Sequence, residues 1–540
     1  MTASGREAKG EGTHASARSR WRGRQAVNDP DPQTLTARSA EHARRRPDQP
    51  AVICEGREVT YAELHRRSNQ TAHALIAEGL RRGARVAYLG RESEHYFEIV
   101  LACAKSGTVL VPVNWRLTSR EVDHVLRDSG AGLLFVESEF LPVVDRVRPD
   151  LPSLGRVVQL DTPGSRADGF LGWRAGHPDD DLDPGTGRDD AVVQMYTSGT
   201  TGLPKGVVLA HRSYFTLVEH MSREEVDWFD WYPEDRSMSC FSALHSAGMG
   251  WFLVGFAAGC THVVMRMFVA EESVRRIRDD GVTIMFAAPA MLRMLLAEPD
   301  ATRQAFTSLR KVTYGGSAIA PSLLRQCMER LNCELAQMYA AAESGSGITC
   351  LAPAEHRPGN PKLSSVGLPC PGNEVRIVNS DGDVLPPGQV GQIRARTPAD
   401  FIEYWHQPEA TKKALVDGWL CMPDAGYLDD DGYLFVLDRL DDAIIVAGQN
   451  IYPAEVETAL AEHPAVAESA VVGVPDERWG QAVKAAVVFH PDRRATARDL
   501  MVFLRGRIAD FKIPTQYDFV ESLPRNPTGK VLRRTLRAQA

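Results

Sequence analysis

The chain has 540 residues, a formal net charge of −8 and 43% hydrophobic residues. That length exceeds what one hydrophobic core supports, so we expect about two to four domains. The acidic balance gives no reason to expect a nucleic-acid partner, and the absence of a run of about eighteen apolar residues argues against a membrane span. Nine cysteines without a Cys-x-x-Cys pair favour a reducing compartment, so the expected location is the cytoplasm.

The first part of the chain predicts an α/β architecture. Residues 1–30 are rich in Arg, Ser, Gly and Ala and lack the apolar core of a secretory signal, so we expect a disordered extension. Thr60 and Glu63 form a capping-box pattern that opens a helix ending near Glu78. Strands and helices then alternate, with strands expected at 85–89, 108–113, 132–137, 156–160 and 282–286 and a helix at 93–105. This alternation predicts a mostly parallel sheet covered by helices.

The most distinctive segment is Tyr196-Thr-Ser-Gly-Thr-Thr-Gly-Leu-Pro-Lys205-Gly206. Its glycines permit close backbone approach, so that amide hydrogens can face an anion, while hydroxyls add donors and Lys205 adds a point charge. Apolar strands at 191–196 and 207–210 flank it, so the loop is expected to join two strands. A Walker P-loop is disfavoured, because that motif places Ser or Thr after its lysine and Gly206 stands there. The order of residues favours a polyphosphate site over a flexible surface loop.

The pattern changes after Gly388 to alternating strands at 391–395 and 433–437, which predict a β-rich subdomain. A further boundary falls near 438–442. Beyond it, helices at 453–462 and 496–510 and strands at 467–474 and 482–489 predict a small α+β domain. The expected organisation is therefore a large domain at 31–438, a boundary at 439–442 and a small C-terminal domain at 443–540.

Several separated motifs, in this order, resemble the adenylate-forming superfamily, in its acyl- and aryl-CoA ligase branch. Besides the loop, they are Tyr314-Gly-Gly-Ser317, Gln337-Met-Tyr339 with Glu343, Asp424 with Gly426-Tyr-Leu, Asp438-Arg439, Asn450-Ile-Tyr-Pro453 and Pro527-Thr-Gly-Lys530. The resemblance covers about residues 35–537. It implies a large adenylation domain of several subdomains at 31–438, a hinge at 439–442 and a small mobile C-terminal lid domain at 443–540.

The resemblance also implies a reaction, in which an acid's carboxylate attacks the α-phosphorus of ATP and pyrophosphate leaves. Charge builds on the α-phosphoryl oxygens, so fixed cations and donors lower the barrier. Lys530 is the implied catalytic cation, and Glu343 the implied ligand of Mg²⁺. The implied nucleotide-binding residues are Thr197, Ser198, Gly199, Thr200, Thr201 and Lys205 for the phosphates, Gly315, Gly316, Ser317 and Tyr339 for adenine, and Asp424 and Arg439 for ribose.

Three further positions bear on the acid and the acceptor. His245 matches a histidine that borders the acyl pocket in CoA ligases, although a lone histidine beside apolar residues is equally well structural. Gly448 matches the glycine that lets the pantetheine arm of coenzyme A approach, and Asp441 matches the hinge. An apolar pocket is expected near Met249 and Trp251, with the strip 340–342.

The sequence departs from the family pattern beside these positions. Ala342 stands where a threonine hydroxyl is usual, Met422-Pro423 precedes Asp424 where Thr-Gly is usual, and Ala447 and Gln449 flank Gly448 where glycine and glutamate are commoner. One lost donor to a charged group could remove about 1.5–3 kcal/mol of stabilisation. The departures leave adenylation as the better supported half-reaction and transfer to CoA as the weaker one.

We therefore expect an ATP-dependent acid:CoA ligase, with a small-molecule acid, ATP, Mg²⁺ and CoA as reactants or cofactors. One alternative is a relative that activates nitrite through AMP and diazotises an aromatic amine. Another is a nucleotide-binding regulatory module without turnover, against which the retained lysine and glutamate argue. A carrier protein in place of CoA is a further open alternative.

Overall fold

The computed structural model describes residues 34–162, 169–197, 204–224, 226, 228–442, 444–446, 449–476, 480–525 and 531–538. The expected extension at 1–30 lies outside these ranges. So do Ser198, Gly199, Thr200 and Thr201 of the predicted phosphate loop, as well as Gly448 and Lys530. For Arg439 and Asp441 the backbone alone is described.

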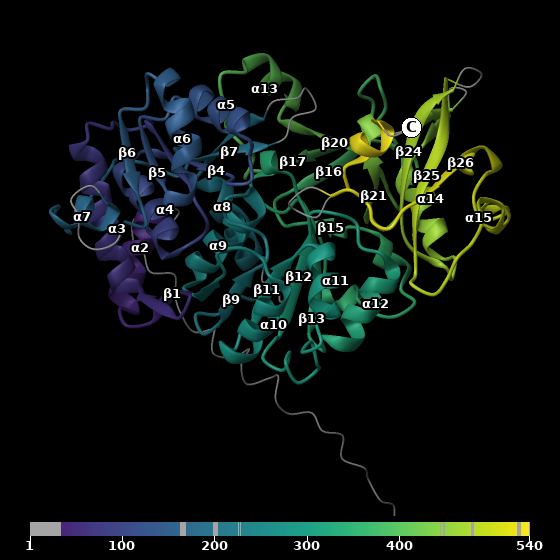
Figure 1. Ribbon diagram of the computed structural model, residues 1–540, viewed down its shortest axis with the longest axis horizontal. Coiled ribbons are helices and arrows are strands. Elements are labelled where there is room, and N and C mark those ends of the chain that lie inside the picture. The colour runs from purple at the N-terminus through teal and green to yellow at the C-terminus, as the bar shows by residue number, and fades with distance from the viewer. Residues whose placement is uncertain are drawn as a thin grey trace, which may run out of the picture. The chain divides into compact units, whose positions relative to one another are not determined.

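The first sheet has seven strands in the order β18-β8-β7-β4-β3-β5-β6 (Figure 1). The central strands β7, β4, β3, β5 and β6 run parallel, whereas β8 and β18 are antiparallel additions at one edge. The strands are β3 (Arg85–Leu89), β4 (Val109–Val113), β5 (Leu133–Val136), β6 (Arg156–Gln159), β7 (Ala191–Thr197), β8 (Lys205–Ala210) and β18 (Glu403–Tyr404). The helices of this region are α2 (Leu35–Arg45), α3 (Tyr61–Ala77), α4 (Glu94–Ser106), α5 (Ser119–Ser129), α6 (Leu141–Val147), α7 (Phe170–Ala175) and α8 (Arg212–Arg223).

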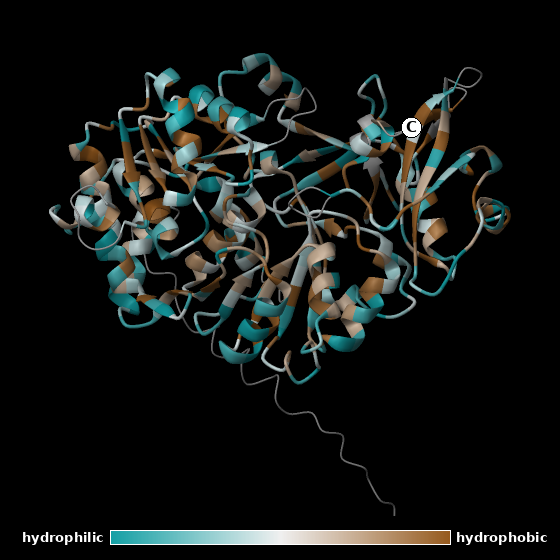
Figure 2. Cartoon of the chain, in the orientation of Figure 1, coloured by the Kyte–Doolittle hydropathy of each residue, from teal (hydrophilic) through white to brown (hydrophobic). Residues whose placement is uncertain are grey.

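Side chains alternate between the two faces along each strand, so this sheet has a hydrophobic core on each face. Val86 and Tyr88 of β3 belong to the cluster that includes α3 and α4, whereas Ala87 and Leu89 belong to the cluster that includes α5 and α6. Successive side chains of a strand point to opposite faces, so continuous apolar strands require helices on both sides. Figure 2 shows these strands in brown and the outer faces of the helices largely in teal.

The second sheet has nine strands in the order β15-β14-β13-β12-β11-β9-β10-β1-β2, parallel from β13 to β1. Its strands are β1 (Pro50–Cys54), β2 (Arg57–Thr60), β9 (Arg236–Ser239), β10 (Thr261–Val264), β11 (Ile284–Ala287), β12 (Lys311–Gly315), β13 (Glu334–Tyr339), β14 (Thr349–Leu351) and β15 (Leu368–Pro369). Its helices are α9 (Ser246–Ala258), α10 (Ala270–Asp279), α11 (Pro289–Ala297) and α12 (Pro321–Arg330). The apolar segment 249–258 lies in α9, where most side chains are buried.

The remaining chain forms two smaller sheets. One consists of β16 (Glu374–Val378), β17 (Gly391–Arg396), β19 (Leu415–Val416), β20 (Trp419–Leu428) and β21 (Leu434–Arg439), with α13 (Pro408–Ala414) beside it. The other consists of β22 (Ile444–Val446), β23 (Gln449–Ile451), β24 (Val466–Asp476), β25 (Gly480–Phe489) and β26 (Gln516–Phe519), with α14 (Pro453–Ala461), α15 (Ala497–Leu504) and α16 (Arg533–Ala538). The α/β class, the β-rich region after Gly388 and the C-terminal α+β region are thus confirmed.

Two local predictions need correction. The helix expected at 496–510 ends at Leu504, because Arg505 has an extended backbone and Gly506 has φ +75°, a left-handed conformation that ends a helix. At the start of α3, Thr60 accepts a hydrogen bond from the Glu63 amide, as expected. The Glu63 carboxylate, however, pairs with Arg67 one turn later, so only half of the capping box forms.

Within the described residues, no helix combines the length and the apolar character that crossing a membrane requires.

Candidate active site

The β7–β8 hairpin positions the two ends of the predicted phosphate loop. Thr197 of β7 lies opposite Lys205 of β8, and Tyr196 lies opposite Gly206. The loop therefore joins two antiparallel strands, as the sequence predicted, and the described residues around it have no Walker-type strand-to-helix geometry. The Lys205 ammonium lies 5.3 Å from the centre of the Tyr404 ring, within the range of a cation–π contact.

Tyr404 connects this lysine to the expected metal ligand. Its short strand β18 pairs with β8, which places the phenol beside Glu343. The hydroxyl donates a 2.6 Å hydrogen bond to Oε1 of Glu343. Burial and the neighbouring Glu343 carboxylate raise the pKa of Tyr404, so the phenol stays protonated and remains a donor.

Glu343 sits on a single turn of 3₁₀ helix, Ala342–Ser344, directly after β13. The Phe401 amide donates to the Glu343 carbonyl at 2.8 Å, which ties this turn to the chain leading into β18. Within the described residues, Oε2 of Glu343 has no hydrogen-bond partner, and no cluster of three or more His, Cys, Asp or Glu could hold a metal. A carboxylate with one open oxygen fits Mg²⁺, which keeps several waters and takes phosphate oxygens as further ligands.

The expected adenine and ribose residues meet across β13 and β20. The Tyr339 hydroxyl donates a 2.6 Å hydrogen bond to Oδ2 of Asp424. Asp424 lies opposite Arg439 in the β20–β21 pairing, so the backbone brings the two ribose candidates together. Gly315 is paired with Met338, the residue before Tyr339, which places the Gly315–Ser317 turn at the same edge of the sheet.

Neighbouring atoms leave little room for a side chain at the two glycines of this turn. Gly316 has φ +79°, and a Cβ there would lie 3.2 Å from the Phe241 ring. A Cβ on Gly315 would lie 2.4 Å from the Met338 carbonyl oxygen. Larger residues would therefore push the turn away from Phe241 and from the Met338 backbone.

His245 is placed by contacts that the sequence did not reveal. It is the N-cap residue of α9, and its Nε2 lies 3.2 Å from Nδ2 of Asn114, which follows β4. Burial, together with the positive charge of Arg116, lowers the pKa of His245, so the imidazole is neutral and Nε2 accepts from the asparagine. The signal for Asn114 was its position directly after a buried parallel strand, where ligand-binding residues collect.

Glu92 is a second residue that the sequence reasoning missed. Its carboxylate accepts a 2.9 Å hydrogen bond from the Ala243 amide, two residues before His245. Burial raises the pKa of Glu92 to about 7. The hydrogen bond to the Ala243 amide makes Glu92 a positioning residue for the His245 turn.

Two of the departures from the family pattern, Ala342 and Pro423, lie within the described residues. Ala342 carries no hydroxyl, and the hydroxyl of the neighbouring Ser344 is engaged with the Ala341 amide and carbonyl. Pro423 is exposed within β20, between the buried Met422 and the half-buried Asp424. Among the described residues, neither change disturbs the Tyr339–Asp424 contact.

The fold and these motifs define an adenylate-forming enzyme, and the chain belongs to the AMP-binding enzyme family. The AMP-binding enzyme family model matches residues 39–405, and the model of the AMP-binding enzyme C-terminal domain matches residues 455–530. The chain is accordingly an AMP-forming, ATP-dependent ligase that activates a carboxylic acid.

Individual relatives show which ligases the chain is similar to. ScoC of Streptomyces coeruleorubidus, a fatty acid–[acyl-carrier-protein] ligase, is 50% identical over 512 residues, which cover 95% of this chain and 97% of that protein. A feruloyl-CoA synthase of an Amycolatopsis species is 35% identical over 94% of this chain and 99% of its own length. The anthranilate CoA ligase AuaEII, solved with anthranoyl-AMP, superposes with a TM-score of 0.85 at 27% identity, covering 94% of this chain and 97% of that structure. These relatives support an acid ligase, and nothing in them supports the nitrite-activating alternative.

Proposed function

We propose that this chain activates a fatty acid as its acyl-adenylate and transfers the acyl group to the thiol of a carrier protein's pantetheine arm. The observation that carries the proposal is the 50% identity to a fatty acid–[acyl-carrier-protein] ligase over nearly the whole of both chains. The contacts among Lys205, Tyr404 and Glu343, and between Tyr339 and Asp424, are consistent with the first half-reaction.

In the proposed first half-reaction, Lys205 and the loop 197–203 bind the β- and γ-phosphates. Glu343, held by Tyr404, supplies a ligand to Mg²⁺, which when bound neutralises phosphate charge. Tyr339 and the Gly315–Ser317 turn bind adenine, while Asp424 and Arg439 bind ribose. Lys530 carries the charge next to the reacting carboxylate and α-phosphate. A contact accelerates adenylation only if it becomes stronger in the transition state, as negative charge shifts onto the phosphoryl oxygens.

In the proposed second half-reaction, the thiol attacks the acyl carbonyl and AMP leaves. Gly448 would pass the pantetheine arm, and neutral His245 would border the acyl group. CoA is the second candidate acceptor, favoured by the feruloyl-CoA synthase relative at 35% identity. Both acceptors present the same phosphopantetheine thiol, and they differ in what carries it, a nucleotide in CoA and a protein in the acyl carrier protein.

The two acceptors are separated by one experiment. Acid-dependent pyrophosphate release is measured first over a panel of fatty and aryl acids, and thioester formation is then measured with CoA and with a holo-acyl carrier protein. We expect pyrophosphate release with fatty acids and faster thioester formation with the carrier protein. Faster transfer to CoA would assign the second candidate, and a lack of pyrophosphate release with every acid would refute both.

A further inference from the structure

Helix α5 makes hydrogen bonds near both ends of the predicted phosphate loop. At the end of β7, the Tyr196 hydroxyl donates a 2.6 Å hydrogen bond to Oδ2 of Asp128. Before β8, Nε2 of His124 lies 2.9 Å from the carbonyl oxygen of Pro204, the residue that precedes Lys205. A carbonyl oxygen can only accept, so Nε2 carries the hydrogen of this bond. His124 and Asp128 are four residues apart and therefore lie on one face of α5.

The Tyr196 phenol is held from a second side by two side chains of the sheet. Nε2 of Gln194 donates to the Tyr196 hydroxyl at 2.9 Å, and Nε of Arg85 donates to Oε1 of Gln194 at 3.0 Å. Burial and the hydrogen bond to Asp128 raise the pKa of Tyr196, so the phenol stays protonated. The hydroxyl therefore donates to Asp128 and accepts from Gln194, which fixes its position between helix and sheet.

A third contact joins α5 to the chain that follows β18. Nε1 of Trp405 donates to the Asp128 carbonyl at 3.0 Å, and the Trp405 amide donates to the Gly206 carbonyl at 2.7 Å. The Arg85 guanidinium lies 3.4 Å from the centre of the Trp405 ring. Because Gly206 is the partner of Tyr196 in the β7–β8 pairing, these contacts form a closed ring from α5 through both strands.

The glycine that follows Lys205 makes room for this arrangement. A Cβ on Gly206 would lie 2.7 Å from Nε2 of Gln194 and 3.1 Å from Cζ of Tyr196. Without a side chain at this position, the amide and the phenol pack directly against the backbone of β8. Gly206 therefore permits the hydrogen bonds that connect Tyr196 to its neighbours.

We propose that His124, Asp128 and Tyr196 are positioning residues that fix the two ends of the phosphate loop for the binding of ATP. The inference rests on the proposed role of this loop in binding the β- and γ-phosphates. Strand pairing alone fixes the backbone at the base of the hairpin, whereas the α5 contacts add side-chain hydrogen bonds near both ends. A binding loop whose ends are fixed in advance loses less conformational freedom when the ligand binds, so it binds more tightly.

Pyrophosphate release measured with varied ATP and varied acid tests the proposal. Tyr196→Phe removes the donor to Asp128, and His124→Phe removes the donor to Pro204. Each substitution should raise KM for ATP about tenfold and leave KM for the acid within about twofold, because the loop is expected to contact the phosphates and not the acid.

A conservative variant separates hydrogen bonding from packing. His124→Gln keeps a side-chain N–H at a similar distance from the backbone, so it can still donate to the Pro204 carbonyl. KM for ATP in this variant should stay within about threefold of the wild-type value, in contrast to His124→Phe. Equal increases in His124→Gln and His124→Phe would overturn the role of the hydrogen bond.

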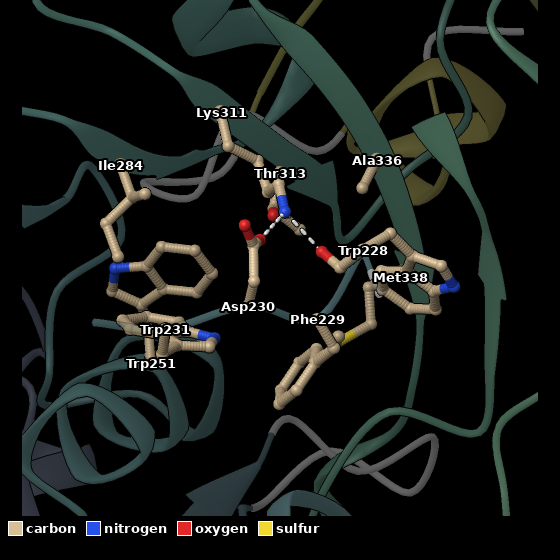
Figure 3. Close-up of a pocket in the computed structure, with 10 residues that line it drawn as sticks. All are labelled: Trp228, Phe229, Asp230, Trp231, Trp251, Ile284, Lys311, Thr313, Ala336 and Met338. Atoms are coloured by element: carbon tan, nitrogen blue, oxygen red, sulfur yellow. Dashed lines mark hydrogen bonds and ion pairs between the residues drawn. The ribbon is translucent and has the colours of Figure 1, made fainter. Parts of the chain in front are cut away.

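The matched control is a buried polar contact on the second sheet. The Lys311 ammonium donates to Oδ1 of Asp230 and to the Trp228 carbonyl, as Figure 3 shows. Asp230→Asn weakens this ion pair, so it should lower the unfolding midpoint without changing KM for ATP. A rise in KM for ATP in this control as large as in Tyr196→Phe would overturn the proposal, because lost stability would then account for both.

Two further results separate this proposal from the one on which it rests. An unchanged KM for ATP in folded Tyr196→Phe and His124→Phe proteins, with a raised KM for ATP in Lys205→Ala, would overturn the positioning role alone. An unchanged KM for ATP in a folded Lys205→Ala protein would instead refute the proposed role of the loop in binding phosphate, and the positioning role with it.

Discussion

At the scale of single residues, the phenol of Tyr404 holds the carboxylate that the proposed metal site needs. Its hydroxyl donates to Glu343 at 2.6 Å while its ring faces Lys205. Tyr404→Phe keeps the ring and removes the donor. A lost hydrogen bond to a charged group costs about 1.5–3 kcal/mol, so kcat/KM for adenylation should fall about 10- to 100-fold. Pyrophosphate release measured over a range of Mg²⁺ concentrations should show a higher requirement for the metal.

The matched control is Tyr214→Phe. The Tyr214 hydroxyl is buried without a hydrogen-bond partner in the described structure, so its removal should leave activity unchanged. Equal activity of Tyr404→Phe and the wild type at every Mg²⁺ concentration would show that the phenol does not position Glu343.

Glu92 provides a pH-dependent test of the His245 turn. Its folded-state pKa of about 7 lies above the ordinary value of 4.5, so the native state binds the proton more tightly than the unfolded state. The associated stability is full below about pH 4.5 and is lost as the pH rises through about 7, by about 3 kcal/mol in total. Glu92→Gln keeps an acceptor for the Ala243 amide and removes the titration. Its free energy of unfolding relative to wild type should therefore improve as the pH rises.

Thermal unfolding at about pH 5.5 and about pH 8.5 provides the measurement. The difference in midpoint between Glu92→Gln and the wild type should be larger in favour of the variant at the higher pH. A difference that is the same at both pH values would show that Glu92 does not titrate in this interval.

At the scale of elements, one glycine allows the Glu343 turn to lie against the chain that precedes β18. Gly345 has φ +67°, and a Cβ there would lie 2.1 Å from the Ala399 carbonyl oxygen. Gly345→Ala combines left-handed strain with a backbone overlap, so it should cost about 2–5 kcal/mol of stability and reduce adenylation. Unfolding in denaturant and pyrophosphate release are the two measurements.

Gly359→Ala is the control that introduces left-handed backbone strain without steric overlap. Gly359 has φ +82° but nothing within 4 Å of its virtual Cβ, so the substitution should cost only about 1–2 kcal/mol and leave activity intact. If both variants lose the same stability and the same activity, close packing against Ala399 is not what fixes the Glu343 turn.

Elements with strong periodic signals could be predicted from the sequence. The strand at 85–89 and the helix ending before Gly107 have the expected bounds within a residue, because apolar alternation and a left-handed glycine mark them locally. The end of α15 could not be placed, since it depends on the backbone of Arg505 and Gly506. Tyr404 was missed because its two-residue strand is specified by pairing with β8 and not by a local pattern.

At the scale of the whole molecule, the alternation of strands and helices predicted a mostly parallel sheet but not its division into a seven-stranded and a nine-stranded sheet. The order β11-β9-β10-β1 joins Pro50–Cys54 to strands about two hundred residues later, and no local signal specifies such a pairing. Long sequence separation also explains why the contacts within the candidate active site could not be predicted. Family motifs identified Tyr339 and Asp424 individually, whereas their hydrogen bond, and the contact of Asn114 with His245, depend on tertiary packing.

The last prediction concerns the role of the C-terminal region, which carries Lys530, in the two half-reactions. If Lys530 acts in adenylation and moves away for thioester formation, the two half-reactions should respond differently to Lys530→Ala. Adenylation should fall by orders of magnitude, because a fixed charge beside the α-phosphate is lost. Transfer from a chemically prepared acyl-adenylate to the pantetheine thiol should stay near the wild-type rate, and the unfolding midpoint should not change. Lys413→Ala, an exposed charge on α13, is the control and should affect neither step. Equal loss of both half-reactions in a folded Lys530→Ala protein would contradict the division of roles.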